Sequence, residues 1–326
     1  MESKKLAVAS AAAAAVTGLA AGASYLTTKV LVDTAVDRDE PGLMKKASHQ
    51  IAGYLIPQET RRAIQEAEKR LLDAPTLPVE ISAHDGLKLA GHWYPCENAK
   101  RVVIAMHGWR SAWSRDYGLV APFMHDNGCS VLFAEQRGQN NSGGDYIGFG
   151  LTERFDCLDW VDWAIKELGG ELPIYLCGLS MGATTVLMAA GLELPENVRG
   201  IVSDCGFTSP EAIWEHIARD NLHISYGWRK ALIGSMYSRR LQVAPDEYST
   251  LDAMKVTKTP ILFIHGTDDH FVPIEMTYEN YKACAAPKKL LVVPGADHGM
   301  SFLVEPAAYE GAVKDFWREH DGRQSP

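Results

Sequence analysis

The 326-residue sequence lacks an excess of positive charge, because 32 lysine and arginine residues stand against 41 aspartate and glutamate residues. The net charge is −9, and there is neither a basic cluster nor a basic stretch with interleaved aromatic residues. The electrostatic signature of a nucleic-acid-binding protein is therefore missing. The six cysteines show no paired spacing such as Cys-x-x-Cys, which argues against a zinc site and a disulfide framework. We expect no metal, no cofactor and no nucleic-acid partner.

Charge is also absent from Leu6 to Thr28, an alanine-dominated stretch that follows Lys4 and Lys5. A basic start, an apolar run and the sequence Ala21-Gly22-Ala23 resemble a secretory signal with its cleavage site. The run also reaches the roughly 18 to 20 residues that span a bilayer. We therefore predict that residues 1–28 are a signal peptide or a membrane anchor. A soluble alanine-rich helix is the alternative.

An exported segment implies a membrane-anchored or secreted protein, with possible membrane attachment through the N-terminus. The positive-inside rule would leave the two lysines in the cytoplasm and the bulk of the chain outside. The cysteines conflict with this location, because six free thiols are unusual in an oxidising compartment. A cytoplasmic location is thus the alternative.

The rest of the chain has the pattern of an α/β protein. Residues 29–74 predict a helical N-terminal extension, and a proline-rich breaker separates them from a catalytic domain over 75–326. Asp85-Gly86 between two alternating runs indicates a hairpin. Short apolar runs then alternate with helical patterns, which predicts a mostly parallel sheet of about eight strands flanked by helices. Residues 208–248 contain no apparent strand and predict a small helical cap.

The segment 173–193 carries the clearest chemical motif. An apolar strand pattern precedes Gly178-Leu179-Ser180-Met181-Gly182, and a small-residue helical pattern follows it. This Gly-x-Ser-x-Gly motif in a strand–turn–helix context is typical of a nucleophile elbow. The alternative is a glycine-flanked helix start with Ser180 as its N-cap. The elbow predicts Ser180 as a nucleophile.

A serine nucleophile needs an imidazole base and a carboxylate, which follow the elbow serine in the order carboxylate, then histidine. Asp269 follows a predicted strand in the spacing Asp-x-x-Val-Pro, and the adjacent Asp268 is the fallback. His298 follows the last predicted strand between glycine-containing segments, so it can reach over the serine. Asp297 is expected to stabilise that loop. Three other histidines are weaker candidates for the base: His107, His265 and His270.

The oxyanion of the reaction needs two backbone N–H donors. The residue after the nucleophile, Met181, supplies one in an elbow, and the loop after the strand Val102 to Met106 supplies the other. Trp109 is the expected donor on that loop, and its side chain can also form a wall of the acyl pocket.

These motifs together resemble the α/β-hydrolase superfamily, over about residues 75 to 320. More narrowly, they resemble small bacterial serine hydrolases and esterases with an N-terminal membrane segment. The motifs that carry the resemblance are His107-Gly108-Trp109, Arg137-Gly138 with Ser142-Gly143-Gly144, the stretch Tyr146 to Asp156, the elbow, Asp269-x-x-Val-Pro273 and Asp297-His298-Gly299. Gln139-Asn140-Asn141 departs from the family, where many relatives have a His-Gly pair.

The resemblance implies the fold, the triad and hydrolysis of carboxylic esters, often with short acyl groups. We therefore expect a serine hydrolase whose partner is a small acyl ester. A peptidase or aminopeptidase is an alternative in which Glu135 or Asp204 could hold a substrate amine, and an acyltransferase is another. Dehalogenases and epoxide hydrolases would need an aspartate at position 180. A non-catalytic binding protein is disfavoured because all triad members are present.

Overall fold

The computed structural model describes residues 21–42 and 57–322, and its centre is one eight-stranded sheet with the order β1-β2-β4-β3-β5-β6-β7-β8. The two neighbour pairs that involve β2 are antiparallel, and the other five neighbour pairs are parallel. This topology confirms the predicted α/β fold. The strands are β1 (Leu77–Ser82), β2 (Lys88–Tyr94), β3 (Arg101–Met106), β4 (Cys129–Ala134), β5 (Ile174–Leu179), β6 (Val198–Asp204), β7 (Ile261–Gly266) and β8 (Lys288–Val293).

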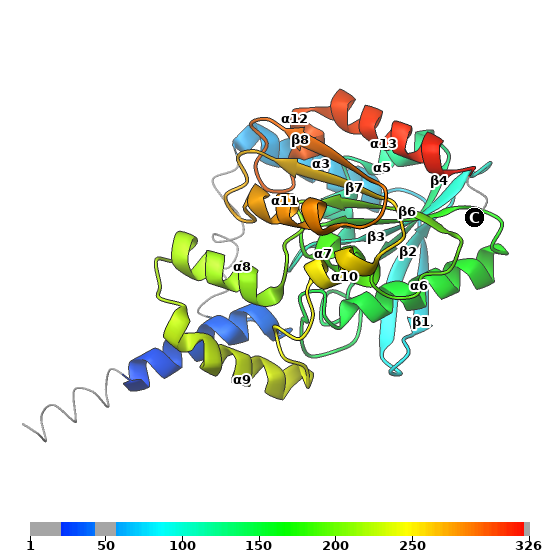
Figure 1. Ribbon diagram of the computed structural model, residues 1–326. Coiled ribbons are helices and arrows are strands. Elements are labelled where there is room, and N and C mark those ends of the chain that lie inside the picture. The colour runs from blue at the N-terminus through cyan, green and yellow to red at the C-terminus, as the bar shows by residue number, and fades with distance from the viewer. Residues whose placement is uncertain (1–20, 43–56, 323–326) are drawn as a thin grey trace, which may run out of the picture.

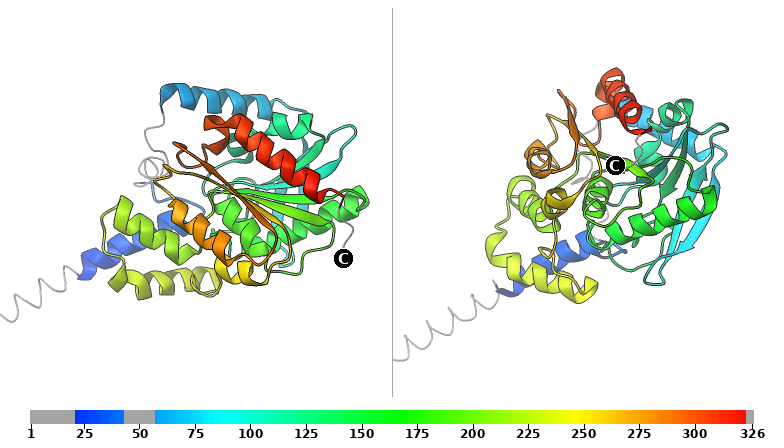
Figure 2. Two further views of the ribbon diagram at one scale, coloured as in Figure 1. Left: turned by 45° about the horizontal axis from the view of Figure 1, so that its top comes forward. Right: turned by 45° about the vertical axis from the view of Figure 1, so that its right-hand side comes forward.

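Helices cover both faces of this sheet (Figures 1 and 2). The helices with assigned bounds are α3 (Gln58–Leu72), α4 (Trp113–Tyr117), α5 (Ala121–Asp126), α6 (Glu153–Leu168), α7 (Met181–Ala189), α8 (Pro210–His216), α9 (Lys230–Leu241), α10 (Thr250–Val256), α11 (Ile274–Ala283), α12 (Ser301–Val304) and α13 (Pro306–His320), of which α8 and α9 lie away from the sheet. A π-helix η1 (Ile217–Asn221) follows α8, and a 3₁₀ turn η2 (Gly227–Arg229) precedes α9.

The central strands are apolar on both sides because each side faces a helical layer. In β3, Val102, Ile104 and Met106 join a core cluster with residues of α6, α7 and α10. Val103 and Ala105 point the other way, into a cluster with residues of α4, α5 and α13. The period of two along the strand thus separates two cores, one on each face.

A third core cluster lies beyond the carboxyl ends of the strands, where the interval 208–248 contributes residues of α8, η1 and α9. Figures 1 and 2 show α8 and α9 beside a helix over residues 21–36, drawn in blue, which we call the N-terminal helix. Its buried side chains include Thr28, Val32 and Val36. Their spacing of four residues places them on one helical face.

The N-terminal helix crosses the boundary at residue 28 that the sequence predicted between a signal or anchor and a helical extension. Residues 1–20 of the predicted signal or anchor lie outside the described residues. Among the described ranges there is no helix with both the length and the apolar character needed to cross a membrane. The prediction of a membrane segment therefore gains no support here.

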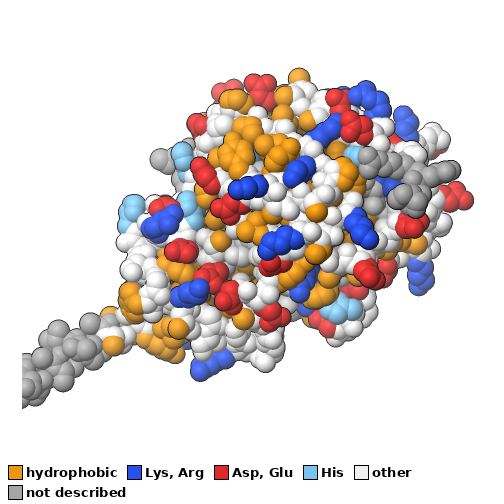
Figure 3. All heavy atoms as spheres, viewed as in Figure 1, with side chains coloured by type: hydrophobic (Ala, Val, Ile, Leu, Met, Phe, Trp, Pro, Cys, Tyr) orange, Lys and Arg blue, Asp and Glu red, His pale blue; other side chains and the backbone are white. Residues whose placement is uncertain are grey.

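Charged side chains of both signs are interspersed over the face seen in Figure 3. Lysine and arginine do not gather into one patch on that face. This distribution is typical of an ordinary solvated surface.

Candidate active site

Ser180 lies in the turn between β5 and α7, with backbone angles φ 56° and ψ −118°. A positive φ is uncommon for a residue with a side chain, so the turn is strained. The flanking glycines explain how the turn fits. A Cβ on Gly178 would lie 2.2 Å from the carbonyl oxygen of Gly182, and one on Gly182 would lie 1.9 Å from that of Met106. Both motif glycines are therefore needed for close backbone packing.

The fold brings together the three residues that the sequence predicted as a triad. His298 Nε2 lies 2.9 Å from Ser180 Oγ, and His298 Nδ1 lies 2.8 Å from Asp269 Oδ2. Ser180 follows β5, Asp269 follows β7, and His298 follows β8. Because these strands are parallel, their carboxyl ends meet at one edge of the sheet. In this geometry the serine hydroxyl can donate to a neutral imidazole that is held by a carboxylate.

Asp269 is buried and is surrounded by hydrogen-bond donors. Its Oδ1 accepts the backbone N–H groups of Phe271 and Val272 at 2.9 and 2.8 Å. Its Oδ2 lies 3.1 Å from Nε2 of His265 and also contacts His298. Burial alone would raise the pKa of Asp269, but His298 and His265 lower the pKa below its usual range. The carboxylate is therefore held in its charged form.

His298 is under two opposing influences. Burial opposes a charge on the imidazole, but the charge of Asp269 outweighs burial and raises the pKa of His298 well above its ordinary value. Phe271 packs edge-on against the imidazole at 5.0 Å between ring centroids. The side chain of His298 remains 16% exposed, so water can reach the imidazole.

The alternatives for the acid and the base lie elsewhere. Asp268 is exposed and accepts a hydrogen bond from the hydroxyl of Thr267. Asp297 accepts the backbone N–H groups of His270 and His298, so it orders the loop as expected. His270 is exposed.

His107 and His265 are both fully buried. Burial lowers the pKa of His107, which accepts the N–H of Gln136 at 3.1 Å. His265 Nδ1 lies 2.6 Å from the Thr277 hydroxyl, and its Nε2 faces Asp269. Both histidines support the loops that carry the site.

The predicted oxyanion donors both belong to the surroundings of Ser180, because Met181 is the next residue and Trp109 lines the same pocket. Met181 begins α7, where the first N–H groups of a helix have no partner within the helix. On the opposite loop, the N–H of Gly108 donates to Asp116 Oδ2 at 2.7 Å, and that of Arg110 donates to Gln139 Oε1 at 2.6 Å. Between them, the N–H of Trp109 has no acceptor within the described residues. Both predicted donors are thus available for a substrate oxygen.

The departure at Gln139-Asn140-Asn141 has a structural role in this loop. Gln139 accepts the Arg110 N–H, and the side chain of Asn140 donates to the Ser111 carbonyl at 2.9 Å. Asn141 donates its backbone N–H to Glu135 at 2.6 Å. The side chains of Gln139 and Asn140 thus hold the loop that carries Trp109, and Asn141 ties its own loop to Glu135.

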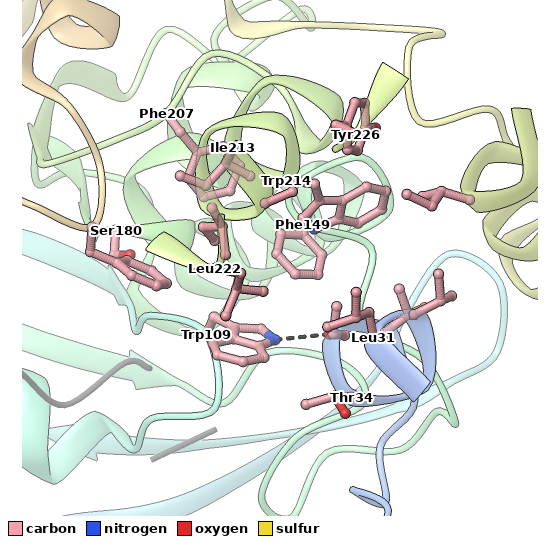
Figure 4. A pocket seen from close by; sticks show the side chains of 17 residues that line it. Leu31, Thr34, Trp109, Phe149, Ser180, Phe207, Ile213, Trp214, Leu222 and Tyr226 are labelled. Carbon is pink, nitrogen blue, oxygen red and sulfur yellow. Dashed lines mark hydrogen bonds between the residues drawn. The ribbon is translucent and has the colours of Figure 1, made fainter. Parts of the chain in front are cut away.

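An apolar pocket opens from Ser180 and encloses about 920 Å³, counting its mouth (Figure 4). Apart from Ser180, Thr34 and Tyr226, every lining residue is apolar. The lining residues are Leu31, Val32, Thr34, Ala35, Val36, Trp109, Phe149, Ser180, Phe207, Ile213, Trp214, Ile217, Ala218, Leu222, Tyr226, Ile233 and Phe271. The pocket therefore suits an apolar group.

The stretch Tyr146 to Asp156 positions one of these walls. The carboxylate of Glu153 accepts the N–H groups of Gly148 and Gly150 at 2.6 and 2.9 Å. These two bonds fix the backbone on both sides of Phe149, whose φ is 55°. Phe149 packs edge-on against Trp214 of α8 at 5.1 Å between ring centroids.

Sequence reasoning missed the contribution of the N-terminal helix to this pocket. Five lining residues come from it, whereas the sequence suggested no chemistry there. The spacing of Thr28, Val32 and Val36 was the available signal, since it marks one buried helical face. This periodicity is hard to recognise in the sequence, because the preceding stretch is rich in alanine.

The two carboxylates considered for a peptidase are buried and engaged. Glu135 contacts His92 Nε2 at 2.8 Å and accepts from Asn141. Asp204 accepts the Ser301 hydroxyl at 3.2 Å, and burial raises the pKa of Asp204 to about 6. Neither carboxylate lines the pocket.

Two groups of side chains in the described ranges have donor atoms close enough to hold a metal. One consists of Cys205, Asp269 and His298, and the other of His84, Asp156 and Asp159. In both groups hydrogen bonds or ion pairs already engage the ligand atoms. His298 pairs with Asp269, His84 with Asp159 at 2.9 Å, and Asp156 with Arg137.

Comparison with known families and proteins identifies relatives of this chain. The family model described as "Alpha/beta hydrolase family" matches residues 102–312. Among curated proteins, the uncharacterized protein YqkD of Bacillus subtilis is 27% identical over 232 residues, covering 71% of this chain and 75% of YqkD. A non-heme haloperoxidase of Rhodococcus erythropolis is 25% identical, covering 68% of this chain and 92% of the haloperoxidase.

Solved structures include similar folds. One structure of the Pyrococcus furiosus esterase Pf2001 is 26% identical with a TM-score of 0.61, covering 77% of this chain and 95% of the esterase. Est1E of Butyrivibrio proteoclasticus, solved with ferulic acid, is 23% identical with a TM-score of 0.59, covering 75% of this chain and all of Est1E. The second likeness concerns the fold alone.

Proposed function

The chain belongs to the alpha/beta hydrolase family, and we propose that it is a serine-dependent esterase that cleaves carboxylic esters through an acyl-serine intermediate. The observation that carries the proposal is the contact of His298 with both Ser180 and Asp269, at 2.9 and 2.8 Å, at the opening of an apolar pocket. The likeness to an esterase that is 26% identical supports it.

In the proposed reaction, neutral His298 takes the proton of Ser180 as Oγ attacks the ester carbonyl carbon. The carbonyl oxygen becomes an oxyanion that accepts the N–H groups of Trp109 and Met181. The imidazolium, stabilised by Asp269, then gives its proton to the leaving alkoxide. The alcohol departs and an acyl-serine remains.

Water completes the cycle. His298 removes a proton from a water molecule, the hydroxide adds to the acyl carbon, and Ser180 leaves with the proton returned by His298. The products are a carboxylic acid and the free enzyme. The short acyl group suggested by the family resemblance stays a prediction.

The test is hydrolysis of p-nitrophenyl esters, from acetate to laurate, by the full chain and by Ser180→Ala. We expect hydrolysis in the full chain and its loss in the variant, with an unchanged far-ultraviolet circular dichroism spectrum. Ester hydrolysis that persists in Ser180→Ala would mean a different nucleophile. A Ser180-dependent rate on amides but none on esters would favour the peptidase alternative.

A further inference from the structure

The N-terminal helix contributes one whole side of the pocket. Its lining residues are Leu31, Val32, Thr34, Ala35 and Val36. Val32 and Val36 also belong to the core cluster that includes Phe149, Met181 and Tyr237. The helix is therefore packed into the site.

Two arginines fix this helix. Arg240 of α9 bonds to Asp33 Oδ1 at 2.6 Å and to Asp37 Oδ1 at 2.5 Å. Arg110, next to the candidate oxyanion donor, donates to the carbonyl oxygens of Thr34 and Arg38 at 2.7 and 3.1 Å. A cation at the last carbonyls of a helix satisfies acceptors that have no partner in the helix. The pocket wall thus has a fixed position relative to Ser180.

The direction of the pocket assigns which part of an ester enters it. His298 must protonate the leaving oxygen, so the alcohol part of the ester lies beside His298. His298 does not line the pocket, whereas Trp109 does. Figure 4 places Ser180 at one side and Leu31 and Tyr226 at the other. Ser180 and Phe271, which contact His298, form one end of the lining. An acyl chain that points away from the leaving oxygen would run from there toward Leu31.

We infer that the N-terminal helix is the selectivity wall of this pocket, and that the enzyme prefers esters whose apolar acyl chain is long enough to reach Leu31. This inference rests on the proposed ester hydrolysis, and it departs from the short acyl group expected from the resemblance. Each methylene buried in an apolar pocket should raise kcat/KM by about fourfold, until the chain reaches the end of the pocket.

Leu31→Trp tests the inference, with Leu26→Trp as the matched control. Leu31 lines the pocket, while Leu26 is on the same helix with 61% of its surface exposed. We expect the full chain to favour p-nitrophenyl octanoate over the acetate by more than tenfold. Leu31→Trp should lower kcat/KM for the octanoate at least tenfold and change the acetate less than twofold. Leu26→Trp should change neither.

Several results would overturn the inference. One is an equal loss on both esters in Leu31→Trp, and another is an unchanged octanoate rate in a variant that retains its unfolding midpoint. A third is that Leu31→Trp lowers kcat/KM for octyl acetate but not for p-nitrophenyl octanoate, which would put the alcohol chain in the pocket.

A binding measurement separates this inference from the proposed function. Calorimetry of methyl octanoate with Ser180→Ala protein needs no turnover. Binding that is lost when Leu31→Trp is added would support the N-terminal helix as the selectivity wall, even if no ester were hydrolysed. Equal binding with and without Leu31→Trp would contradict this role of the helix, even if ester hydrolysis were established.

Discussion

The indole nitrogen of Trp109 donates a 2.9 Å hydrogen bond to the carbonyl oxygen of Ala35. This bond joins the loop that carries a candidate oxyanion donor to the N-terminal helix. The next residue, Arg110, reinforces the junction through the carbonyl oxygen of Thr34. The position of the backbone N–H of Trp109 thus depends on a helix whose residues lie more than seventy positions earlier in the chain.

Trp109→Phe should weaken turnover without removing the backbone donor. The ring is kept, but the hydrogen bond to Ala35 is lost, and a bond of this kind contributes about 0.5–1.5 kcal/mol. We expect kcat to fall by about two- to tenfold for the acetate and the octanoate alike. Steady-state kinetics measure this, with Trp228→Phe as a control because Trp228 is 60% exposed. An unchanged kcat would mean that the bond from Trp109 to Ala35 is not needed to position the loop.

Arg240→Ala should loosen the N-terminal helix. The change leaves Asp33 and Asp37 without their shared cation, and hydrogen bonds to charged groups contribute about 1.5–3 kcal/mol. We expect a lower free energy of unfolding and faster proteolysis within residues 21–36. The neighbouring Arg239 is exposed, so Arg239→Ala is the control. Equal protease resistance in the two variants would argue that the bonds from Arg240 to Asp33 and Asp37 do not stabilise the N-terminal helix.

Asp269→Asn and Asp268→Asn form a matched pair that tests the acid. Asp269 contacts His298 at 2.8 Å, whereas Asp268 is exposed. Replacing the acid of a well-studied triad by asparagine lowers kcat by about 10⁴. We expect a loss of that order in Asp269→Asn and little change in Asp268→Asn. The reverse result would reassign the acid.

The pH profile should report the pKa of His298. Asp269 outweighs burial and raises that pKa well above its ordinary value. Since only the neutral imidazole accepts the proton of Ser180, kcat/KM should rise with pH through a midpoint above about 6.5. In Asp269→Asn the midpoint should move to lower pH, because the raising charge is gone. A midpoint that stays at the same pH would show that a group other than His298 controls the rise of kcat/KM with pH.

Gly182→Ala should destabilise the protein because the new Cβ would meet the Met106 carbonyl oxygen at 1.9 Å. Overpacking of this kind costs about 1–3 kcal/mol or more. Gly311 is in α13 with open space around its Cβ position, so Gly311→Ala should stabilise by about 0.5–1 kcal/mol. Thermal unfolding compares the two. Similar midpoints would show that the elbow has room for a side chain.

The sheet could be predicted because its signals are local. Apolar runs such as Val102 to Met106 mark buried strands by themselves, and Asp85-Gly86 marks the hairpin. The geometry of Ser180, Asp269 and His298 follows from the parallel strands that precede these residues, so motif spacing was enough to suggest it.

The far wall of the pocket could not be predicted, because nothing local connects residues 21–36 to the elbow. The hydrogen bonds from Arg240 to Asp33 and Asp37 join residues that are about two hundred positions apart in the sequence. None of these three residues is part of a recognisable motif. An alanine-rich, uncharged start also fits a signal peptide or an anchor. Composition does not show which side chains of this stretch pack against the rest of the chain, because that depends on tertiary contacts.

The most direct measurement is labelling of the full chain with a fluorophosphonate probe, followed by mass spectrometry of the modified peptide. The account predicts one adduct on Ser180, absent in Ser180→Ala and strongly reduced in His298→Ala, because the imidazole activates the hydroxyl. An intact protein that never labels, or an adduct on another serine, would contradict it.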